Sequence, residues 1–331
     1  MELVFQFDSM NSTRRYVIGG PSRSGKTLLG SYLRAAQSDL AWFPLEGHLY
    51  KPLGGKDGAP ADRAFVYLNK ARNFSEVKSE VASPAEFVDA DKVCLEIDQL
   101  DNRFDDPGII SAVLDRFARD DGKKGWIVAD VHAEFWFRSL ATSIRGLKII
   151  IIYRNPIESV CANIYWRTFP HRLDNANSHI AYRSLMWALS AQVGLRLKEE
   201  FPNQVLLLNI NELLSQSEPM FTVLREFLGL SSLTRPGPEI FPRPWYSVIG
   251  SGDVHTSPDD QRRQLLTNDE MLFINALTNT EQVLMGFATD RLEEKFRAPF
   301  SLRSLKEVVK ILGRLSPIAA KGLLNMSLRL P

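Results

Sequence analysis

Eight consecutive residues near the amino terminus have the types and spacing that bind a phosphate group. They follow an apolar run at 16–18, precede apolar helical positions that start at Leu28, and read Gly20, Pro21, Ser22, Arg23, Ser24, Gly25, Lys26 and Thr27. This is the G-x-x-x-x-G-K-T spacing of a P-loop. Its small residues let successive backbone N–H groups surround an anion, and the following helix adds unpaired N–H groups and its positive dipole end. Lys26 supplies a mobile charge and Thr27 a hydroxyl, so the segment predicts a phosphate site.

A second charged group follows another apolar run. Residues 148–153 read as a buried strand, and Arg154, Asn155 and Pro156 come directly after it. An arginine at the end of a strand can hold a phosphate through paired, charge-assisted hydrogen bonds. It can equally pair with a carboxylate at the same edge of the sheet. Pro156 suits the first position of a helix, in which Ser159 would follow.

The segments that must position these groups alternate between strand and helix patterns. Apolar runs typical of buried parallel strands occur at 16–18, 126–129, 148–153 and 205–209. Helical patterns occur at 27–37, 156–166, 178–200, 218–228 and 267–285, and Gly229 reads as a helix C-cap. The alternation predicts an α/β fold, a P-loop NTPase-like three-layer domain with a central mostly parallel sheet.

Ligands of such sheets bind at the carboxyl ends of the strands. We therefore expect residues 20–27, 130–132, 154–155 and 211–212 to lie along one edge. Along the chain we expect a leader at 1–14, the P-loop domain at 15–290 and a basic amphipathic tail at 291–331. Within the domain, residues 50–110 are rich in Gly, Pro, Asp and Lys, and we interpret them as a variable insertion that can form part of an acceptor pocket.

Composition excludes several classes of protein. The 331 residues are 44% hydrophobic and 24% charged, as is usual for globular proteins, and the net charge of +1 gives no field for binding nucleic acid. The two cysteines, Cys94 and Cys161, form neither a disulfide framework nor a zinc site, and we expect Cys161 in the core. No secretory pattern opens the chain, and the apolar run at 147–153 is too short to cross a bilayer. We therefore expect a cytoplasmic protein.

The segment 301–331 carries six basic residues and one acidic residue, with leucines and Val309 at helical spacing opposite the charges. Such a helix can make peripheral contact with an anionic membrane. It can also dock on the domain with its charged face in water, and we favour docking because apolar stripes usually face a core. The oligomeric state has no signal in the sequence.

Together, the two charged segments resemble the sulfotransferase family. Members carry a P-loop-like 5′-phosphosulfate loop, often RSG-Ser/Thr-Ser/Thr-LL, and later a 3′-phosphate motif in which a strand ends in R-D/N-P. Here the loop reads RSGKTLL from Arg23, and the strand end reads YRNP from Tyr153. Residues 125–132, 205–214 and 218–230 resemble further segments of the family, so the similarity spans about 15–230, with a closing helix at 267–285.

The resemblance implies transfer of a sulfuryl group from 3′-phosphoadenosine-5′-phosphosulfate (PAPS) to a hydroxyl or amine of a small molecule or glycan, without a metal. Residues 20–28, including Leu28, would bind the 5′-phosphosulfate, and Lys26 and Arg23 would stabilise charge on the bridging oxygen. Arg154 would bind the 3′-phosphate with Ser159 nearby. The chain departs from the family where Ala162 replaces a serine, where Ala129 replaces a lysine, and at Lys26, where many members have Ser or Thr.

Transfer to a hydroxyl needs a group that takes its proton. Glu46, in a segment that resembles the "y-EP" segment of carbohydrate-type sulfotransferases, ranks first, and His132 ranks second. For each of them the alternative is an ordinary solvated side chain.

Two other functions stay open. Residues 126–130 form an apolar strand that ends in Asp130, the pattern that holds Mg²⁺ in P-loop kinases. An ATP/Mg-dependent kinase is therefore the first alternative. A non-catalytic nucleotide-binding module is the second, and it would account for Ala162 and Ala129.

Overall fold

The computed structural model describes residues 13–35, 39–46, 105–165, 176–215, 218–233 and 265–287. Five strands form one sheet in the order β2-β3-β1-β4-β5, and all neighbours pair in parallel. They are β1 (Arg14–Gly19), β2 (Leu40–Glu46), β3 (Gly125–Ala129), β4 (Leu147–Tyr153) and β5 (Val205–Asn209). The predicted α/β class with a parallel sheet is confirmed.

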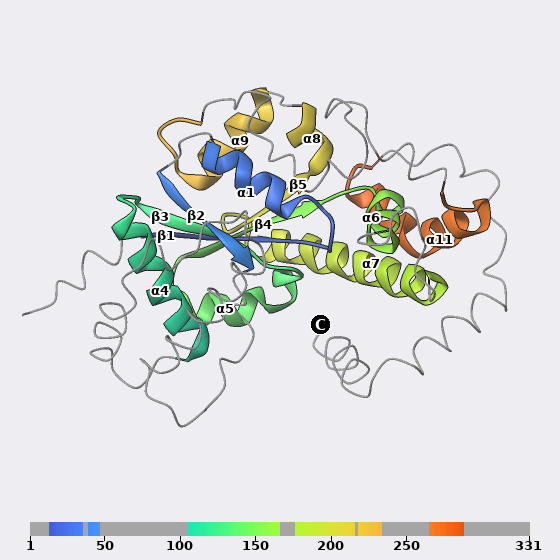
Figure 1. Ribbon diagram of the computed structural model, residues 1–331, viewed down its shortest axis with the longest axis horizontal. Helices are drawn as coiled ribbons and strands as arrows, with labels where there is room; N and C mark the ends of the chain where they lie inside the picture. The colour runs from blue at the N-terminus through green and yellow to red at the C-terminus, as the bar shows by residue number, and fades with distance from the viewer. Residues whose placement is uncertain are drawn as a thin grey trace, which may run out of the picture. The chain divides into compact units, whose positions relative to one another are not determined.

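Helices cover both faces of this sheet. Figure 1 shows α1 (Lys26–Ala35), α8 (Ile210–Ser215) and α9 (Glu218–Leu228) on one face, with α4 (Asp106–Asp120) and α5 (Phe137–Ser143) on the other. A short 3-10 helix, η3 (Ala133–Trp136), precedes α5. The arrangement has the three layers that the sequence predicts. No helix of the described residues is long and apolar enough to span a bilayer.

The chain divides into two compact units. The first contains the sheet and comprises residues 1–153 and 193–250, and the second comprises residues 154–192 and 251–331. The second unit contains α6 (Pro156–Ile164), the first part of α7 (Ala176–Glu200) and α11 (Asn268–Leu284). Its core joins Ile157, Val160 and Ile164 of α6 to Ile180 and Ile274. Cys161 is fully buried in this core, as the sequence predicts.

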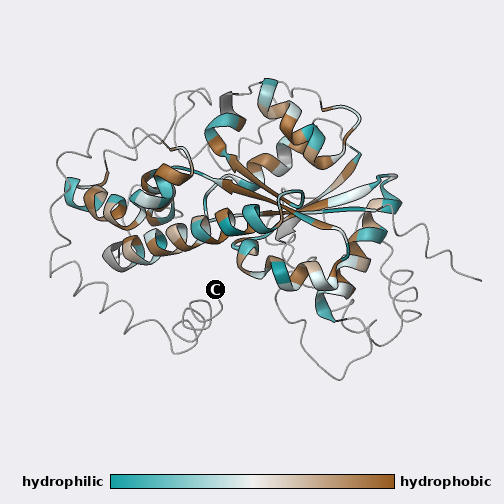
Figure 2. Ribbon diagram, turned by 180° about the vertical axis from the view of Figure 1, so that it is seen from behind, coloured by the Kyte–Doolittle hydropathy of each residue, from teal (hydrophilic) through white to brown (hydrophobic). Residues whose placement is uncertain are grey.

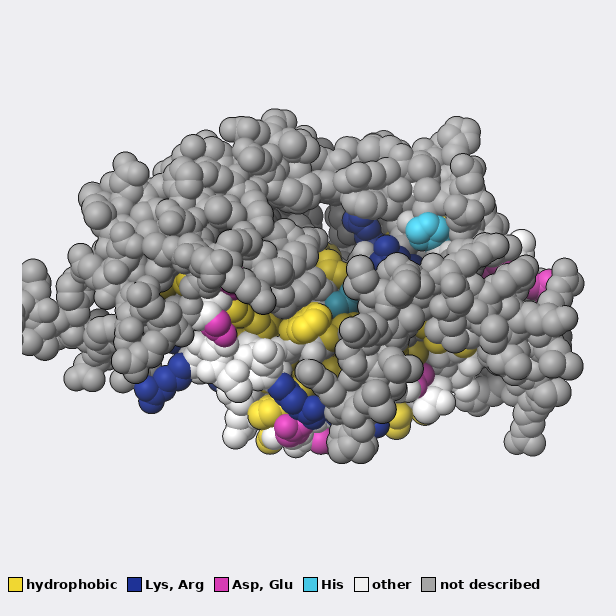
Figure 3. All heavy atoms as spheres, turned by 90° about the horizontal axis from the view of Figure 1, so that it is seen from below, with side chains coloured by type: hydrophobic (Ala, Val, Ile, Leu, Met, Phe, Trp, Pro, Cys, Tyr) yellow, Lys and Arg dark blue, Asp and Glu magenta, His cyan; other side chains and the backbone are white. Residues whose placement is uncertain are grey.

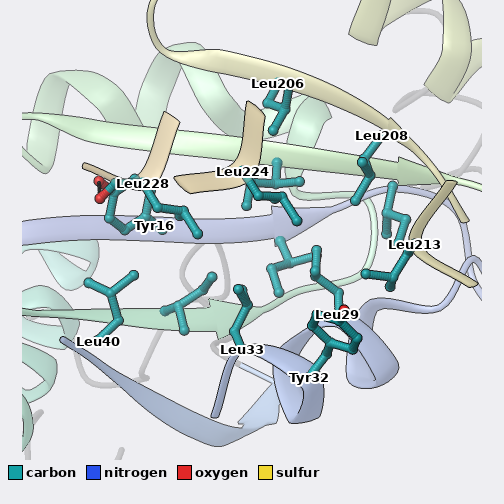
Figure 4. Packing of buried hydrophobic residues seen from close by; sticks show 14 of the residues in the cluster. Tyr16, Leu29, Tyr32, Leu33, Leu40, Leu206, Leu208, Leu213, Leu224 and Leu228 are labelled. Carbon is teal, nitrogen blue, oxygen red and sulfur yellow. Dashed lines mark hydrogen bonds between the residues drawn. The ribbon is translucent and has the colours of Figure 1, made fainter. Parts of the chain in front are cut away.

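The core of the first unit fixes α1, and with it the loop before α1. Figure 2 shows hydrophobic residues concentrated along the strands, while the helices carry both hydrophobic and hydrophilic residues. Leu29 and Leu33 of α1 pack with Tyr16 of β1 and with Leu224 and Leu228 of α9 (Figure 4). Burial of a leucine side chain contributes about 2 kcal/mol to stability. The helix that follows the P-loop is thus anchored by its apolar face.

One strand and several helices were not predicted. β2 contains Pro44, which lacks a backbone N–H, and its pairing with β3 shifts in register between Phe43 and Glu46. A proline is tolerated there because β2 is an edge strand. Neither η3 nor α4, α5 and α8 was predicted, and α4 begins within the segment that we interpret as an insertion. Residues 50–104 and 291–331 lie outside the described residues.

Two predicted helix ends are explained by their caps. Gly229 has a φ of 60°, and its N–H donates to the carbonyl of Glu226, while Leu230 N–H donates to that of Arg225. This is the left-handed cap expected after α9. At α11, the Thr267 hydroxyl accepts from Glu270 N–H and the Glu270 carboxylate accepts from Thr267 N–H. This capping box sets the start of α11.

Candidate phosphate-binding site

The loop between β1 and α1 has the backbone conformation of an anion cradle. Gly20 and Gly25 have φ values of 115° and 103°, in the left-handed region that favours glycine, and Arg23 has a φ of 66°. A Cβ on Gly20 would lie 2.3 Å from the carbonyl oxygen of Ile152, and one on Gly25 would lie 2.4 Å from Cδ1 of Ile210. Both glycines of the motif are therefore required by their neighbours in β4 and α8.

Lys26 is buried, and its ammonium group lies against this loop. Nζ donates to the carbonyl oxygens of Gly20 at 3.1 Å and Pro21 at 2.5 Å. α1 begins at Lys26 and has no acidic residue in its first turn, so the positive end of the helix is not offset there. Thr27 is exposed and Ser24 is fully buried. The loop thus combines a cation, a hydroxyl and a helix amino terminus, as a phosphate requires.

Hydrogen bonds join the turn after β3 to Gly20 of the loop and to Ile18 at the end of β1. Asp130 N–H donates to the Ile18 carbonyl at 2.9 Å, and His132 N–H donates to the Gly20 carbonyl at 3.1 Å. The Glu134 carboxylate accepts from Gly20 N–H at 2.7 Å. Residues 20–27 and 130–132 are therefore neighbours at one edge of the sheet, as predicted.

Glu134 is the residue that sequence reasoning missed. It is 1% exposed, and its Oε1 lies 3.2 Å from Nδ1 of His132. His132 has a φ of 61°, and its ring stacks on Phe135 with centroids 5.3 Å apart. This left-handed turn brings the His132 ring to the carboxylate that also accepts from Gly20 N–H. The sequence signal was an acidic residue two positions after a histidine at a strand end, which is common on protein surfaces.

Other predicted residues also lie at this edge. Glu46 ends β2 in register with Ala129, one residue before the fully buried Asp130. Ile210, the first residue of α8, approaches Gly25 as described above, which brings the end of β5 to the loop. Asn211 N–H donates to the Asn209 side chain, and both Asn211 and Glu212 are exposed. The P-loop thus lies at the carboxyl ends of the strands, in contact with the turn after β3, with Ile152 of β4 and with Ile210 directly after β5.

Arg154 follows β4 and is the first residue of the second unit. Its Nε lies 3.4 Å from Oε2 of Glu158, one helical turn later, so the carboxylate pairing considered from the sequence is observed. Asn155 caps α6 by accepting from Ile157 N–H at 3.0 Å. Ser159 is buried, and Ala162, the position at which the resembled family has a serine, is 7% exposed. Position 162 therefore offers no side-chain donor.

Among the described residues, no group of three or more His, Cys, Asp or Glu side chains could hold a metal ion.

Comparison with known proteins adds structural similarity at low identity. No family model matches the chain, and no curated protein matches it. It is similar to the sulfotransferase domain of the Synechococcus PCC 7002 olefin synthase at 16% identity and a TM-score of 0.44, covering 90% of this chain and 94% of that one. It is similar to the sulfotransferase domain of the curacin biosynthetic pathway at 18% identity and a TM-score of 0.44, covering 92% and 98%.

A third structure, sulfotransferase STF9 from Mycobacterium avium, is 12% identical with a TM-score of 0.43, over 84% of this chain and 78% of that one. At this level of similarity, the function of the chain has to be argued from its own residues.

Proposed function

We propose that the protein is a sulfotransferase that moves a sulfuryl group from PAPS to a hydroxyl or amine acceptor, with a small molecule or glycan as substrate. The observation that carries the proposal is the β1–α1 loop, a cradle with Lys26 against its carbonyls, next to a strand that continues into Arg154. β4 pairs with β1 along its length, from Leu147 with Arg15 to Ile151 with Gly19. PAPS has phosphate groups at two positions of one ribose. The loop supplies a cation for the 5′ position, and Arg154 is the cation that the sequence resemblance assigns to the 3′ position.

The loop fits the 5′ end of this donor by its chemistry. Its backbone N–H groups and the start of α1 favour an anion, and Gly20 and Gly25 leave no side chain in the cradle. When bound, PAPS supplies the sulfuryl group and a phosphate that departs with the bridging oxygen. Lys26 would exchange the carbonyls of Gly20 and Pro21 for this oxygen, with Arg23 beside it, and stabilise the charge that develops there.

His132 is the base that we favour for the acceptor proton. Its Nδ1 lies 3.2 Å from Glu134, and this carboxylate is itself held by the loop at Gly20. A carboxylate in this position orients an imidazole ring and stabilises the positive charge that the ring acquires with the proton. Glu46 stays a second candidate because β2 ends at the same edge of the sheet.

One observation favours the kinase alternative. Asp130 is fully buried directly after β3, and β3 is the neighbour of β1 in the sheet. In a P-loop kinase, an acidic residue in this place holds the water shell of Mg²⁺, and a threonine such as Thr27 contacts the ion. ATP would then be the donor nucleotide.

A transfer assay tests the proposal. Purified protein would be incubated in EDTA with PAPS labelled on the sulfuryl group and a panel of hydroxyl and amine acceptors. We expect label on an acceptor, with adenosine 3′,5′-bisphosphate formed in equal amount, and no transfer by Lys26→Met. Phosphorylated acceptors and ADP, formed only from ATP with Mg²⁺, would replace this proposal with the kinase. Nucleotide binding with neither product would favour the non-catalytic module.

A further inference from the structure

Arg183 on α7 is a half-buried cation, and none of the roles described above accounts for its position. Its Nε is shielded from solvent and donates no hydrogen bond to any described residue. The described neighbour of its guanidinium is the ring of Tyr182, 5.3 Å from the charge. Burial lowers the pKa of Arg183, with the tyrosine opposing that effect. A guanidinium N–H removed from water without an acceptor costs free energy, which binding of an anion would recover.

Arg183 lies one helical turn before Trp187, the residue of α7 that contacts the segment before α6. Trp187 is one helical turn further along, is 1% exposed, and donates from Nε1 to the carbonyl of Arg154 at 2.9 Å. Residues four apart lie on one face of a helix, and a helical side chain slants toward the helix amino terminus. The Trp187 side chain thus slants toward residue 183, and its Nε1 contacts the Arg154 backbone on that side. All three residues belong to the second unit.

Among the described residues of this region, one positive charge has no carboxylate partner. Arg154 and Glu158 form an ion pair at 3.4 Å, and their charges cancel. Arg183 has no carboxylate partner among the described residues, and its Nε is buried without an acceptor there. Figure 3 shows basic side chains of described residues at the surface of one face of the molecule. A phosphate monoester carries more than one negative charge at neutral pH and accepts from several guanidinium N–H groups at once. One arginine already engaged with Glu158 is a weak site for such an anion, and two arginines make a much stronger one.

We propose that Arg183 is a second cation of a phosphate site that it forms with Arg154, and that the ligand is the 3′-phosphate of the donor nucleotide. This inference rests on the proposed function, because only a 3′-phosphorylated nucleotide presents that group. Arg183 then has a specificity role. It distinguishes adenosine 3′,5′-bisphosphate from adenosine 5′-phosphate, which lacks the 3′-phosphate.

Calorimetric titration of both nucleotides into wild type and Arg183→Met tests this role. Methionine keeps much of the buried aliphatic volume and removes the charge. We expect Arg183→Met to weaken bisphosphate binding at least about tenfold and to change 5′-phosphate binding less than about threefold. Calorimetry distinguishes changes in Kd of these two sizes. Arg196→Met is the matched control, because Arg196 is an exposed arginine on the same helix, and it should leave both affinities unchanged.

Thermal unfolding of the ligand-free variant separates this role from a structural one. Removal of a half-buried charge that has no carboxylate partner in the described part of the chain should leave the melting temperature unchanged or raise it. An unchanged preference for the bisphosphate in Arg183→Met, or an equal loss for both nucleotides, would overturn the role of Arg183 alone. A wild-type protein that binds the two nucleotides equally would overturn both this inference and the function on which it rests.

Discussion

Glu134 accepts a hydrogen bond from the backbone N–H of Gly20 at 2.7 Å, and so links the turn after β3 to the first glycine of the P-loop. The other oxygen of the same carboxylate lies 3.2 Å from Nδ1 of His132. Because Glu134 is buried, it holds the cradle and the candidate base in one arrangement without competing solvent. Two substitutions distinguish these two roles.

Glu134→Gln should retain the bond to Gly20, since an amide oxygen also accepts, and should lose the charge opposite His132. We expect bisphosphate affinity within about threefold of wild type and turnover lowered at least about 100-fold, the scale of a misdirected general base. Glu134→Ala should in addition lower the free energy of unfolding by about 1–3 kcal/mol, because Gly20 N–H is left without its acceptor. Steady-state kinetics and urea unfolding measure the two effects, and equal turnover of Glu134→Gln and wild type would contradict a role for His132.

Gly20→Ala should destabilise the protein strongly. The new Cβ would lie 2.3 Å from the carbonyl oxygen of Ile152, and the residue would keep a φ of 115°. Strain of this kind costs about 1–3 kcal/mol before the clash is counted. Gly122→Ala is the matched control, because its φ is 66° and, in the described part of the chain, no atom beyond its chain neighbours would lie within 4 Å of the added Cβ. If urea denaturation gives the same loss of unfolding free energy for both variants, the close contact between the loop and β4 is contradicted.

Lys26→Met should weaken binding of adenosine 3′,5′-bisphosphate at least about tenfold, since a hydrogen bond to a charged group contributes about 1.5–3 kcal/mol. Lys123→Met is a control of the same residue type, placed just before β3 and therefore at the opposite end of the strands. Calorimetry should show wild-type affinity for this control. Wild-type affinity in Lys26→Met as well would remove Lys26 from the site.

The buried hydroxyl of Tyr16 should make the free energy of unfolding decrease at alkaline pH. Its hydroxyl donates to the Leu228 carbonyl at 2.6 Å, and burial raises the pKa of Tyr16 from 10.0 to about 12, against a smaller opposing effect of the Arg14 charge. Between these values the unfolded chain loses a proton that the folded chain keeps, so stability decreases as pH rises, by about 2–3 kcal/mol in all. Tyr16→Phe should cost about 1 kcal/mol near neutral pH and flatten this decline. An equally steep decline of the free energy of unfolding in Tyr16→Phe would contradict the assignment of this pH dependence to Tyr16.

The fold was largely predictable because its signals are local. The apolar run of β4 and the glycines of the P-loop each follow from the residues themselves, since a buried parallel strand and a left-handed turn restrict composition. β2 was missed because Pro44 interrupts its pattern. α4 was missed although Asp105 caps it by accepting from Gly108 N–H at 3.0 Å, a start signal with a proline in the first turn.

The site was less predictable because its contacts join distant parts of the chain. Glu134 reaches Gly20 across 114 positions, and only the pairing of β1 with β3 brings them together. The partner of Arg154 is local, but the sequence leaves open whether that arginine meets a carboxylate or a phosphate. Arg183 has no motif, and only the structure shows that its Nε is buried without an acceptor among the described residues.

The most direct test of the central claim is a binding comparison by calorimetry. Adenosine 3′,5′-bisphosphate would be titrated into the wild-type protein in EDTA, and ATP would be titrated with Mg²⁺. We predict tight binding of the bisphosphate without a metal, weaker binding of Mg-ATP, and a loss of more than about 2 kcal/mol of bisphosphate affinity in Arg154→Ala. Tight binding of Mg-ATP with none of the bisphosphate would contradict the sulfotransferase and favour the kinase.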